Sequence, residues 1–183
     1  MKIGITGSIS SGKSTVAKIL SKNKNLLFSA DKIVQDFYKS TKFKKKIKKK
    51  FKIKNGDVKK QIKKELLCEK ISLNSLGKFI HPFVRQKMKA FYKKNKNKKI
   101  LFFEIPLLIE SNLISFFDFI ILVVSPKKLR LKRYKKNGGD ERMFKLLDKG
   151  QMPAKKKLKY SDYLIVNNSS KSILKKRVNG IIK

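Results

Sequence analysis

The run from Gly7 to Ser14 combines a glycine-rich turn with a lysine and a hydroxyl group, the residue types that bind phosphate groups. It reads GSISSGKS and is followed by Thr15, so it matches the pattern G-x-x-x-x-G-K-[ST] in full. In such a loop, successive backbone N–H groups form a nest for anions, and the positive end of the following helix points at the same phosphates. Lys13 would reach the β and γ phosphates, Ser14 would bind Mg²⁺ and Thr15 would contact the α phosphate. The sequence therefore predicts a site for ATP and Mg²⁺, made of Gly7, Ser8, Ile9, Ser10, Ser11, Gly12, Lys13, Ser14 and Thr15.

Two carboxylates at the ends of predicted strands could complete a site for phosphoryl transfer. Asp31 lies in the segment SADKI, where it could accept the proton of an attacking hydroxyl group. It could equally be an N-cap or first-turn aspartate of the next helix, and this residue alone does not decide between the two. Glu104 lies in FFEIPLLIES, where it could hold a water on Mg²⁺ or orient Asp31, and Pro106 would turn the chain over the site. Glu110 is expected to be a solvated or capping carboxylate.

His81 is the single histidine and is followed by Pro82 in the segment IHPFVR. A lone histidine is more often a capping or core group than a site residue. Arg85 lies one helical turn further on, and together the two side chains could bind a phosphate or a ribose. The residues themselves leave both interpretations open.

Strands and helices must alternate to bring these residues together. The glycine-rich loop stands between a short apolar strand and a helix with apolar residues at positions 16, 17, 19 and 20. Apolar strands separated by helical patterns indicate a parallel sheet covered on both faces, with ligands at the carboxyl ends of its strands. The predicted fold class is therefore α/β, a three-layer α/β/α P-loop NTPase fold. The predicted strands are Lys2–Thr6, Leu26–Phe28, Ile100–Ile105, Phe119–Val124 and Tyr163–Val166.

A chain of 183 residues is long enough for one domain with an inserted lobe. The core that carries the strands is predicted at residues 1–40, 98–128 and 154–183. Residues 41–97 are lysine-rich and helical in pattern, and they are predicted to form a helical lobe. Residues 129–153 are basic and interrupted at Gly138-Gly139, and they are predicted to form a helical lid.

The formal net charge of +37 comes from 49 basic and 12 acidic residues. Such a charge raises nucleic acid or an anionic membrane as a partner. However, only five of the basic residues are arginines, the residue that DNA readers use for bidentate contacts. We therefore interpret the lysine excess as compositional drift that leaves a solvated surface, with no specific nucleic-acid partner. The single cysteine, Cys68, and apolar runs too short to cross a bilayer predict a cytoplasmic protein without a membrane contact.

Taken in order along the chain, the motifs resemble those of the dephospho-CoA kinase family. The resemblance rests on TGSISSGKST, SAD, IHPFVR, EIPLLIE, a helix that ends in LRLKR, Gln151-Met152-Pro153 with Lys157 after it, and SDYLIVNN. It spans nearly the whole chain. It implies a kinase that uses ATP and Mg²⁺ to phosphorylate the ribose 3′-hydroxyl of dephospho-CoA, the last step of coenzyme A biosynthesis.

The resemblance also implies roles for individual residues. Three residues would be catalytic: Asp31 as the general base on the 3′-hydroxyl, Lys13 at the β and γ phosphates, and Arg133 on the lid, which would neutralise the transferring phosphoryl group. Residues 41–97 would bind the CoA portion. Gln151, Lys157 and Asp162 would supply packing and adenine-side contacts, and Asn167 would belong to the ATP site. The residues implied in substrate binding are Asp31, His81, Arg85, Glu104, Pro106 and Leu107.

The chain also departs from the family pattern. Ser8 and Ser10 stand where the family usually has glycines, so the backbone must avoid positive φ there or accept strain of about 1 kcal/mol at each position. Affinity for ATP is therefore expected to be lower than in the family. Ser29 replaces the first acid of the family's D-A-D, and Glu104 replaces an aspartate.

Other functions remain open at this level. A small-molecule kinase for a nucleoside or nucleotide would share the phosphate loop, and a basic nucleic-acid-binding ATPase would show a steep salt dependence. A folded enzyme of low activity is a third possibility. GTPases are disfavoured because their guanine-recognition sequence, N-K-x-D, is absent. Nothing in the sequence favours one oligomeric state.

Overall fold

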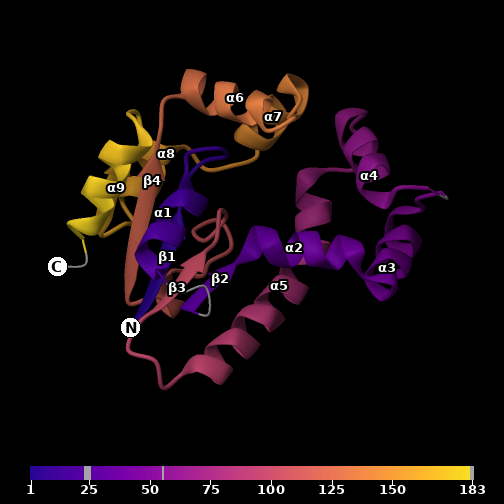
Figure 1. Cartoon of the computed structure of the whole chain (residues 1–183). Helices are drawn as coiled ribbons and strands as arrows, with labels where there is room; N and C mark the ends of the chain where they lie inside the picture. Colours follow the sequence, from indigo (N-terminus) through magenta and orange to yellow (C-terminus); the bar gives the residue numbers. More distant parts are fainter. Residues whose placement is uncertain (23–25, 55, 182–183) are drawn as a thin grey trace.

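The computed structural model describes residues 1–22, 26–54 and 56–181, and its centre is a five-stranded sheet (Figure 1). The strands are all parallel and lie in the order β2-β3-β1-β4-β5. The predicted α/β class with a parallel sheet is confirmed, and each strand begins and ends within one residue of its predicted bounds. These bounds are β1 Lys2–Thr6, β2 Leu27–Ser29, β3 Leu101–Glu104, β4 Phe119–Val124 and β5 Tyr163–Val166.

The central strand, β1, leads directly into the glycine-rich loop and then into helix α1 (Lys13–Ser21). The chain adds β2 and β3 on one side of β1, and β4 and β5 on the other. The strand order therefore reverses next to β1, which is where ligands bind in open parallel sheets. This topology places the ends of β1, β2, β3 and β4 around the glycine-rich loop.

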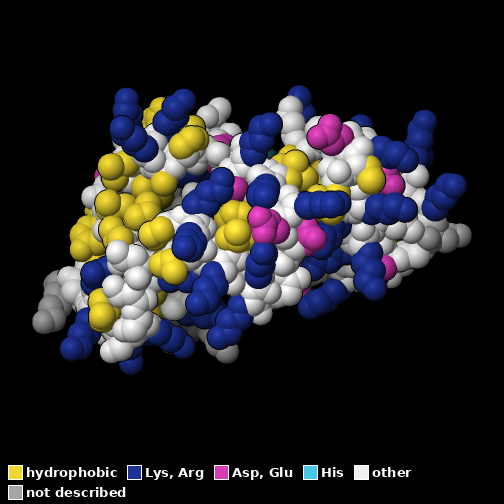
Figure 2. Space-filling model, turned by 90° about the horizontal axis from the view of Figure 1, so that it is seen from above, with side chains coloured by type: hydrophobic (Ala, Val, Ile, Leu, Met, Phe, Trp, Pro, Cys, Tyr) yellow, Lys and Arg dark blue, Asp and Glu magenta, His cyan; other side chains and the backbone are white. Residues whose placement is uncertain are grey.

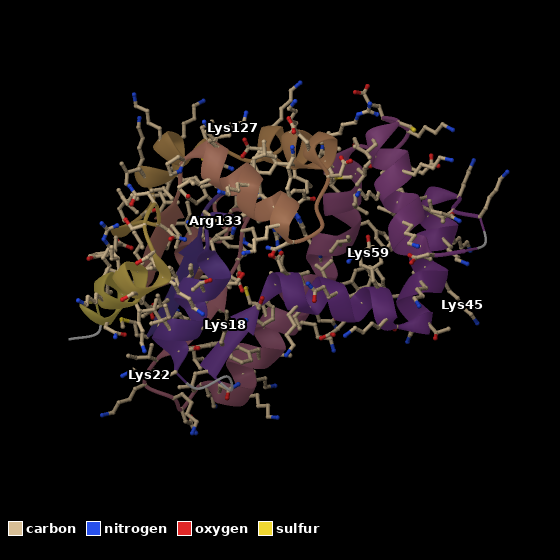
Figure 3. The ribbon with its side chains drawn as sticks, turned by 45° about the horizontal axis from the view of Figure 1, so that its top comes forward. Lys18, Lys22, Lys45, Lys59, Lys127 and Arg133 are labelled. Carbon is tan, nitrogen blue, oxygen red and sulfur yellow. The ribbon has the colours of Figure 1, made fainter. Side chains whose placement is uncertain are left out.

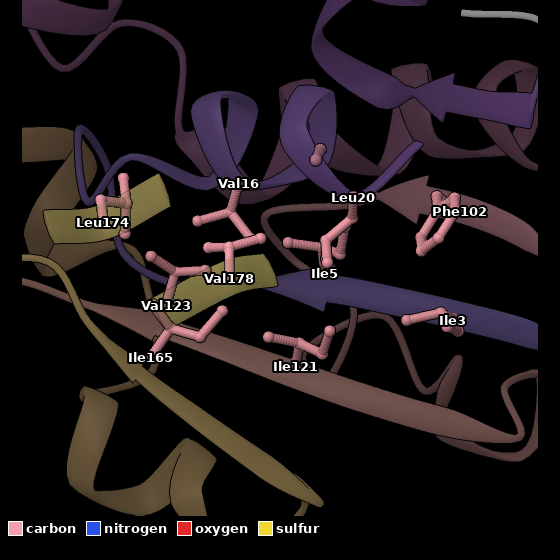
Figure 4. Packing of buried hydrophobic residues seen from close by; sticks show 11 residues of the cluster. Ile3, Ile5, Val16, Leu20, Phe102, Ile121, Val123, Ile165, Leu174 and Val178 are labelled. Atoms are coloured by element: carbon pink, nitrogen blue, oxygen red, sulfur yellow. The ribbon is translucent and has the colours of Figure 1, made fainter. Parts of the chain in front are cut away.

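Helices α1 and α9 (Lys171–Asn179) cover one face of the sheet. Val16 and Leu20 on α1, together with Leu174 and Val178 on α9, pack against strand residues such as Ile5 (Figure 4). In each helix the two residues are four positions apart, so they lie on the same side of the helix. This packing holds the amino end of α1 at the carboxyl end of β1.

The opposite face is covered by helix α5 (Leu73–Asn95) and by the segment after β3, which contains the short helix η2 (Ile114–Phe116). Phe103 on β3 is fully buried, and its ring lies 5.5 Å from that of Phe91 on α5 and 5.4 Å from that of Phe117. Both contacts are edge-to-face, a geometry worth about 0.5–1.5 kcal/mol per pair beyond burial. Helix α8 (Ala154–Leu158) contacts β4.

The remaining helices extend away from the sheet (Figure 1). Helix α2 (Ala30–Lys39) leads to α3 (Thr41–Phe51) and α4 (Val58–Leu67), and their apolar residues form a cluster of their own with part of α5. Helices α6 (Lys127–Lys136) and α7 (Glu141–Lys149) follow β4, and Met143 on α7 joins this cluster. In the part of the chain that the structure describes, no helix is long and apolar enough to span a membrane.

Candidate functional site

The glycine-rich loop packs so closely against its neighbours that two of its positions accept only glycine. Gly7 has a φ of 146°, and a Cβ there would lie 2.2 Å from the carbonyl oxygen of Val123 at the end of β4. Gly12 has a φ of 100°, and a Cβ there would lie 2.1 Å from Nδ2 of Asn167. Gly12 is also the N-cap of α1, and its carbonyl oxygen accepts from the amide of Val16 at 3.1 Å. These two glycines therefore seat the loop against β4 and Asn167.

The two serines that stand in place of expected glycines differ in conformation. Ser10 has a φ of 56°, in the left-handed region, whereas Ser8 has no positive φ. For a residue with a Cβ, the left-handed conformation costs about 1 kcal/mol. The loop thus avoids the strain at Ser8 and accepts it at Ser10.

Lys13, the first residue of α1, is only 6% exposed. Its Nζ donates a hydrogen bond to the carbonyl oxygen of Ser8 at 2.8 Å. Burial lowers the pKa of Lys13 from 10.5 to about 8, and the nearby carboxylates of Asp31 and Glu104 oppose this shift. The ammonium group is therefore in place beside the loop, next to two acids.

Glu104, at the end of β3, is 3% exposed, and both of its carboxylate oxygens have partners. Oε1 accepts a hydrogen bond from the hydroxyl of Ser14, and Oε2 accepts one from the hydroxyl of Ser29 at 2.8 Å. Glu104 thereby joins the start of α1 to the end of β2. No hydrogen bond among the described residues links it to Asp31, but its negative charge helps to raise the pKa of Asp31.

Asp31 lies in the first turn of α2, and the N-cap of that helix is Ser29. The residue is exposed to solvent, yet neighbouring protein atoms partly desolvate its carboxylate. Burial raises the pKa of Asp31, Lys13 lowers it and Glu104 raises it further. Asp31 is thus a first-turn residue of α2, and its charge interacts with that of Lys13 in the phosphate loop.

Asn167 contacts the glycine-rich loop directly, and Arg133 is linked to the loop through Asn167. The Nη1 of Arg133 donates to the hydroxyl of Ser125 at 3.0 Å, and its Nη2 donates to the carbonyl oxygen of Asn167 at 3.1 Å. The Nδ2 of Asn167 donates in turn to the carbonyl oxygen of Ser11 at 2.8 Å. In Figure 3, Arg133 lies between α6 and the start of α1, whereas Lys45 lies at the far end of the molecule. The structure thus brings both predicted residues to the loop.

Two residues hold the loop at Ile9, and the sequence analysis missed this role for both. Oε1 of Gln151 accepts from the amide of Ile9 at 2.8 Å, and Nη1 of Arg130 donates to the carbonyl oxygen of Ile9 at 3.4 Å. Arg130 also forms an ion pair of 2.5 Å with Asp148. The family resemblance implies packing and adenine-side contacts for Gln151, and it implies no role for Arg130. Arginine is rare in this lysine-rich chain, and that rarity was the available signal.

Glu110 is not the solvated or capping carboxylate that was expected, because its side chain is only 20% exposed and pairs with a buried lysine. Its Oε1 accepts from Nζ of Lys157 at 2.9 Å and from the amide of Met152 at 2.9 Å. Lys157 is fully buried, and a buried charge needs a counter-charge. The pair therefore ties the segment after β3 to α8.

Pro106 turns the chain across the end of β1, as expected. Its carbonyl oxygen accepts hydrogen bonds from Oγ1 of Thr6 and from Nζ of Lys157, both at 3.0 Å. Leu107 follows and is half-buried. The segment after β3 is thereby fixed beside the phosphate loop.

His81 and Arg85 lie one turn apart on α5, which continues through Pro82. His81 is half-buried, and burial together with the neighbouring Arg85 lowers its pKa. Nη2 of Arg85 donates to the carbonyl oxygen of Ser111 at 2.7 Å, which links α5 to the segment after β3. Among the described residues, no hydrogen bond joins His81 or Arg85 to the glycine-rich loop.

Known proteins are similar to this chain in sequence and in fold along nearly its whole length. The model of the family described as dephospho-CoA kinase matches residues 1–172. A dephospho-CoA kinase from Fusobacterium nucleatum is 35% identical over 187 residues, which cover 97% of this chain and 95% of that protein. The solved dephospho-CoA kinase from Campylobacter jejuni superimposes with a TM-score of 0.64 at 27% identity, covering 100% of this chain and 96% of that one. The Thermus thermophilus protein TT1252 has the same fold, with a TM-score of 0.75 at 24% identity and the same two coverages.

Proposed function

The chain belongs to the dephospho-CoA kinase family, and we propose that its phosphate-loop site carries the γ-phosphoryl group of ATP to the ribose 3′-hydroxyl of dephospho-CoA, giving coenzyme A and ADP. The chain is an ATP-dependent kinase with a hydroxyl group as acceptor. One observation carries the assignment of the site. Lys13, Glu104 and Asp31 meet at the carboxyl ends of neighbouring strands, and the charges of the first two act on the pKa of Asp31.

The glycine-rich loop would hold the phosphates of ATP. Residues 7–15 offer backbone N–H groups and the amino end of α1, and Lys13 would bind the β and γ phosphates. Asn167 already contacts the loop at Ser11, which supports its place in the ATP site.

The residues beside the loop fit Mg²⁺. The hydroxyl of Ser14 and the carboxylate of Glu104 are hydrogen-bonded to each other, and both are the hard oxygen ligands that Mg²⁺ prefers. The protein would supply the Ser14 hydroxyl directly and the Glu104 carboxylate through water. When bound, Mg²⁺ would neutralise charge on the phosphates.

Asp31 would act as the general base. Its carboxylate would take the proton of the 3′-hydroxyl as that oxygen attacks the γ phosphorus and the bond from phosphorus to the leaving oxygen of ADP breaks. A base works best when its pKa is not far below the working pH. The raised pKa of Asp31 supports this role.

Charge neutralisation would come from Lys13 and Arg133. Phosphoryl transfer asks a protein for positioning and electrostatic stabilisation rather than for covalent chemistry. Residues 129–153 would act as a lid that brings Arg133 from Ser125 to the transferring group. Closure of the lid would exclude water and thereby suppress hydrolysis of ATP.

The helical lobe of residues 41–97 would receive the CoA portion, with His81, Arg85, Glu104, Pro106 and Leu107 on the side of the reacting ribose. A cavity of about 720 Å³ between α2, α3 and α4 supports this assignment. Its lysines suit a substrate that carries phosphate groups. They are Lys39, Lys44, Lys45, Lys48 and Lys59.

The test is phosphoryl transfer from Mg·ATP to dephospho-CoA, with adenosine and AMP as competing acceptors. We expect conversion of dephospho-CoA to coenzyme A, and a loss of roughly 100-fold or more in Asp31→Asn and in Lys13→Ala. Asp36→Asn is the matched control, because Asp36 is exposed on the same helix and its carboxylate pairs with Lys39 alone among the residues that the structure describes. Preference for adenosine or AMP would overturn the assignment of the acceptor.

A nucleic-acid-stimulated ATPase is the alternative from another class. Figure 2 shows Lys and Arg side chains spread over the middle, right and edges of the visible face rather than gathered in one stripe, with hydrophobic side chains grouped on the left; the spread of the basic side chains supports a solvated surface. Single-stranded DNA is therefore expected not to stimulate hydrolysis of ATP.

A cytoplasmic location belongs to the same proposal, and the exposed free thiol of Cys68 supports it, because thiols stay reduced in the cytosol.

A further inference from the structure

The backbone N–H and C=O of Ile9, which belong to two consecutive peptide groups, are both hydrogen-bonded by residues from the chain after β4. Gln151 accepts from the amide at 2.8 Å, and Arg130 donates to the carbonyl oxygen at 3.4 Å. Ile9 is 142 residues from Gln151 in the sequence. This is a long-range contact to the backbone of a loop that is otherwise held by its own turns and by Asn167.

The two holding side chains are themselves fixed. Arg130 is 8% exposed, donates from Nε to the carbonyl oxygen of Ser125 at 3.1 Å, and lies over the ring of Phe144. Gln151 stands next to Met152, whose amide donates to Glu110. Gln151 thereby limits rotation of the Ser8–Ile9 peptide group, and Arg130 limits rotation of the Ile9–Ser10 peptide group.

The residue after Ile9 is the one that needs this restraint. Ser10 has a φ of 56°, a conformation that a residue with a side chain leaves readily for negative φ when nothing prevents it. Such a change would turn the peptide groups on either side of Ser10. The amides that follow in the nest for phosphate would then point elsewhere.

We infer that Gln151 is a positioning residue for ATP: by holding the Ser8–Ile9 peptide group, next to the Ile9–Ser10 peptide group that Arg130 contacts, it helps to keep Ser10 in the left-handed conformation that preforms the phosphate nest. The restraint does for this loop what a glycine at position 10 would do by conformational freedom. The inference rests on the proposed function in one respect, since it places ATP in this loop. It adds a role for a residue outside the phosphate-loop motif.

The experiment is a double-mutant cycle of Gln151→Met and Ser10→Gly, read by calorimetric binding of Mg·ATP and by steady-state transfer. Met keeps the length of Gln but cannot accept from the amide. We expect Gln151→Met to weaken binding of ATP about five-fold when Ser10 is present and less than about two-fold in the Ser10→Gly background. The KM for ATP should rise accordingly, while the KM for dephospho-CoA stays within about two-fold.

Lys149→Met is the matched control, because Lys149 is exposed just before Gln151 and should leave binding within about two-fold. Gln151→Ala, which removes the acceptor without added bulk, should repeat the pattern, and thermal melting should show all variants folded. Exchange of the Ile9 amide with solvent deuterium should accelerate in both Gln151 variants. Equal losses in the two backgrounds, or no loss in either, would overturn the inference. If the wild-type protein binds Mg·ATP but ignores dephospho-CoA, the proposed function fails while the binding cycle still decides the role of Gln151.

Discussion

Replacing Lys13 by Met is expected to abolish phosphoryl transfer and, in the same protein, to stabilise the fold. Lys13 is 6% exposed, and burial lowers its pKa from 10.5 to about 8 in spite of Asp31 and Glu104. One pKa unit corresponds to about 1.4 kcal/mol, so the charged ammonium reduces the free energy of unfolding at neutral pH by roughly 3 kcal/mol. Met loses the hydrogen bond to Ser8, which is worth about 1 kcal/mol. The variant should therefore be more stable than the wild type by about 2 kcal/mol at pH 7.

The pH dependence of this difference follows from the same shift. The unfolded chain keeps the proton of Lys13 up to its ordinary pKa of 10.5, whereas the folded protein releases it near pH 8. Between these two values the unfolded state binds more protons, so the wild type gains stability as the pH rises. The Met variant lacks this gain. Its advantage should be complete below pH 8 and should disappear as the pH passes 10.5.

Urea unfolding at several pH values measures both quantities, and it is done without nucleotide because bound ATP would stabilise the wild type. Lys18→Met is the matched control: Lys18 lies on the same helix but is exposed, so its loss should change stability by less than about 0.5 kcal/mol. A Lys13→Met variant that is less stable than the wild type at pH 7 would refute the reasoning. So would an advantage that does not change with pH.

Three further predictions concern catalysis and the buried ion pair. The kcat/KM for ATP should fall above about pH 8, because Lys13 loses its charge there; a profile of kcat/KM that stays flat to about pH 9.5 would contradict this. The kcat should fall at acid pH, because Asp31, whose pKa is raised, becomes protonated. Arg133→Met should lower kcat by at least roughly 100-fold in steady-state assays, while the KM for ATP changes less. Equal changes in kcat and KM would contradict a role of Arg133 in the transition state. Lys157→Met leaves the carboxylate of Glu110 without its buried partner and should lower the free energy of unfolding by about 3–5 kcal/mol. Adding Glu110→Gln should recover part of the lost free energy of unfolding, measured by urea unfolding. Equal free energies of unfolding in the single and double variants would contradict a stabilising Glu110–Lys157 ion pair.

The strands and the phosphate loop could be predicted because their signals are local. The apolar runs of β3 and β4, and the turn between β1 and α1, are properties of neighbouring residues, and the structure confirms the parallel α/β fold. The pattern of the glycine-rich loop likewise depends on eight consecutive residues. In both cases short-range sterics and periodicity carry the information.

The family could also be identified from the sequence, because its motifs stand in order along nearly the whole chain. The comparisons with known kinases agree with that reading. The roles of Asp31, Arg133 and the substrate-binding residues remain predictions, and the structure supplies the geometry on which to test them. Glu110 was misread, because no local pattern shows that Lys157, 47 positions further on, is buried against it.

The sequence by itself determined the fold, the phosphate loop and the family. Each of these can be recognised from contiguous residues or from the order of motifs along the chain. Only the tertiary structure decided which side chains complete the site. Gln151 reaches Ile9 across 142 positions, and Glu104 joins Ser14 to Ser29 across the ends of three strands. Such contacts depend on how the sheet and the helices pack, and packing is a property of the whole chain. Ser10 is an example: the sequence shows a serine where a glycine is expected, and the structure shows that this serine is left-handed and that the backbone of Ile9 before it is bonded to Gln151 and Arg130.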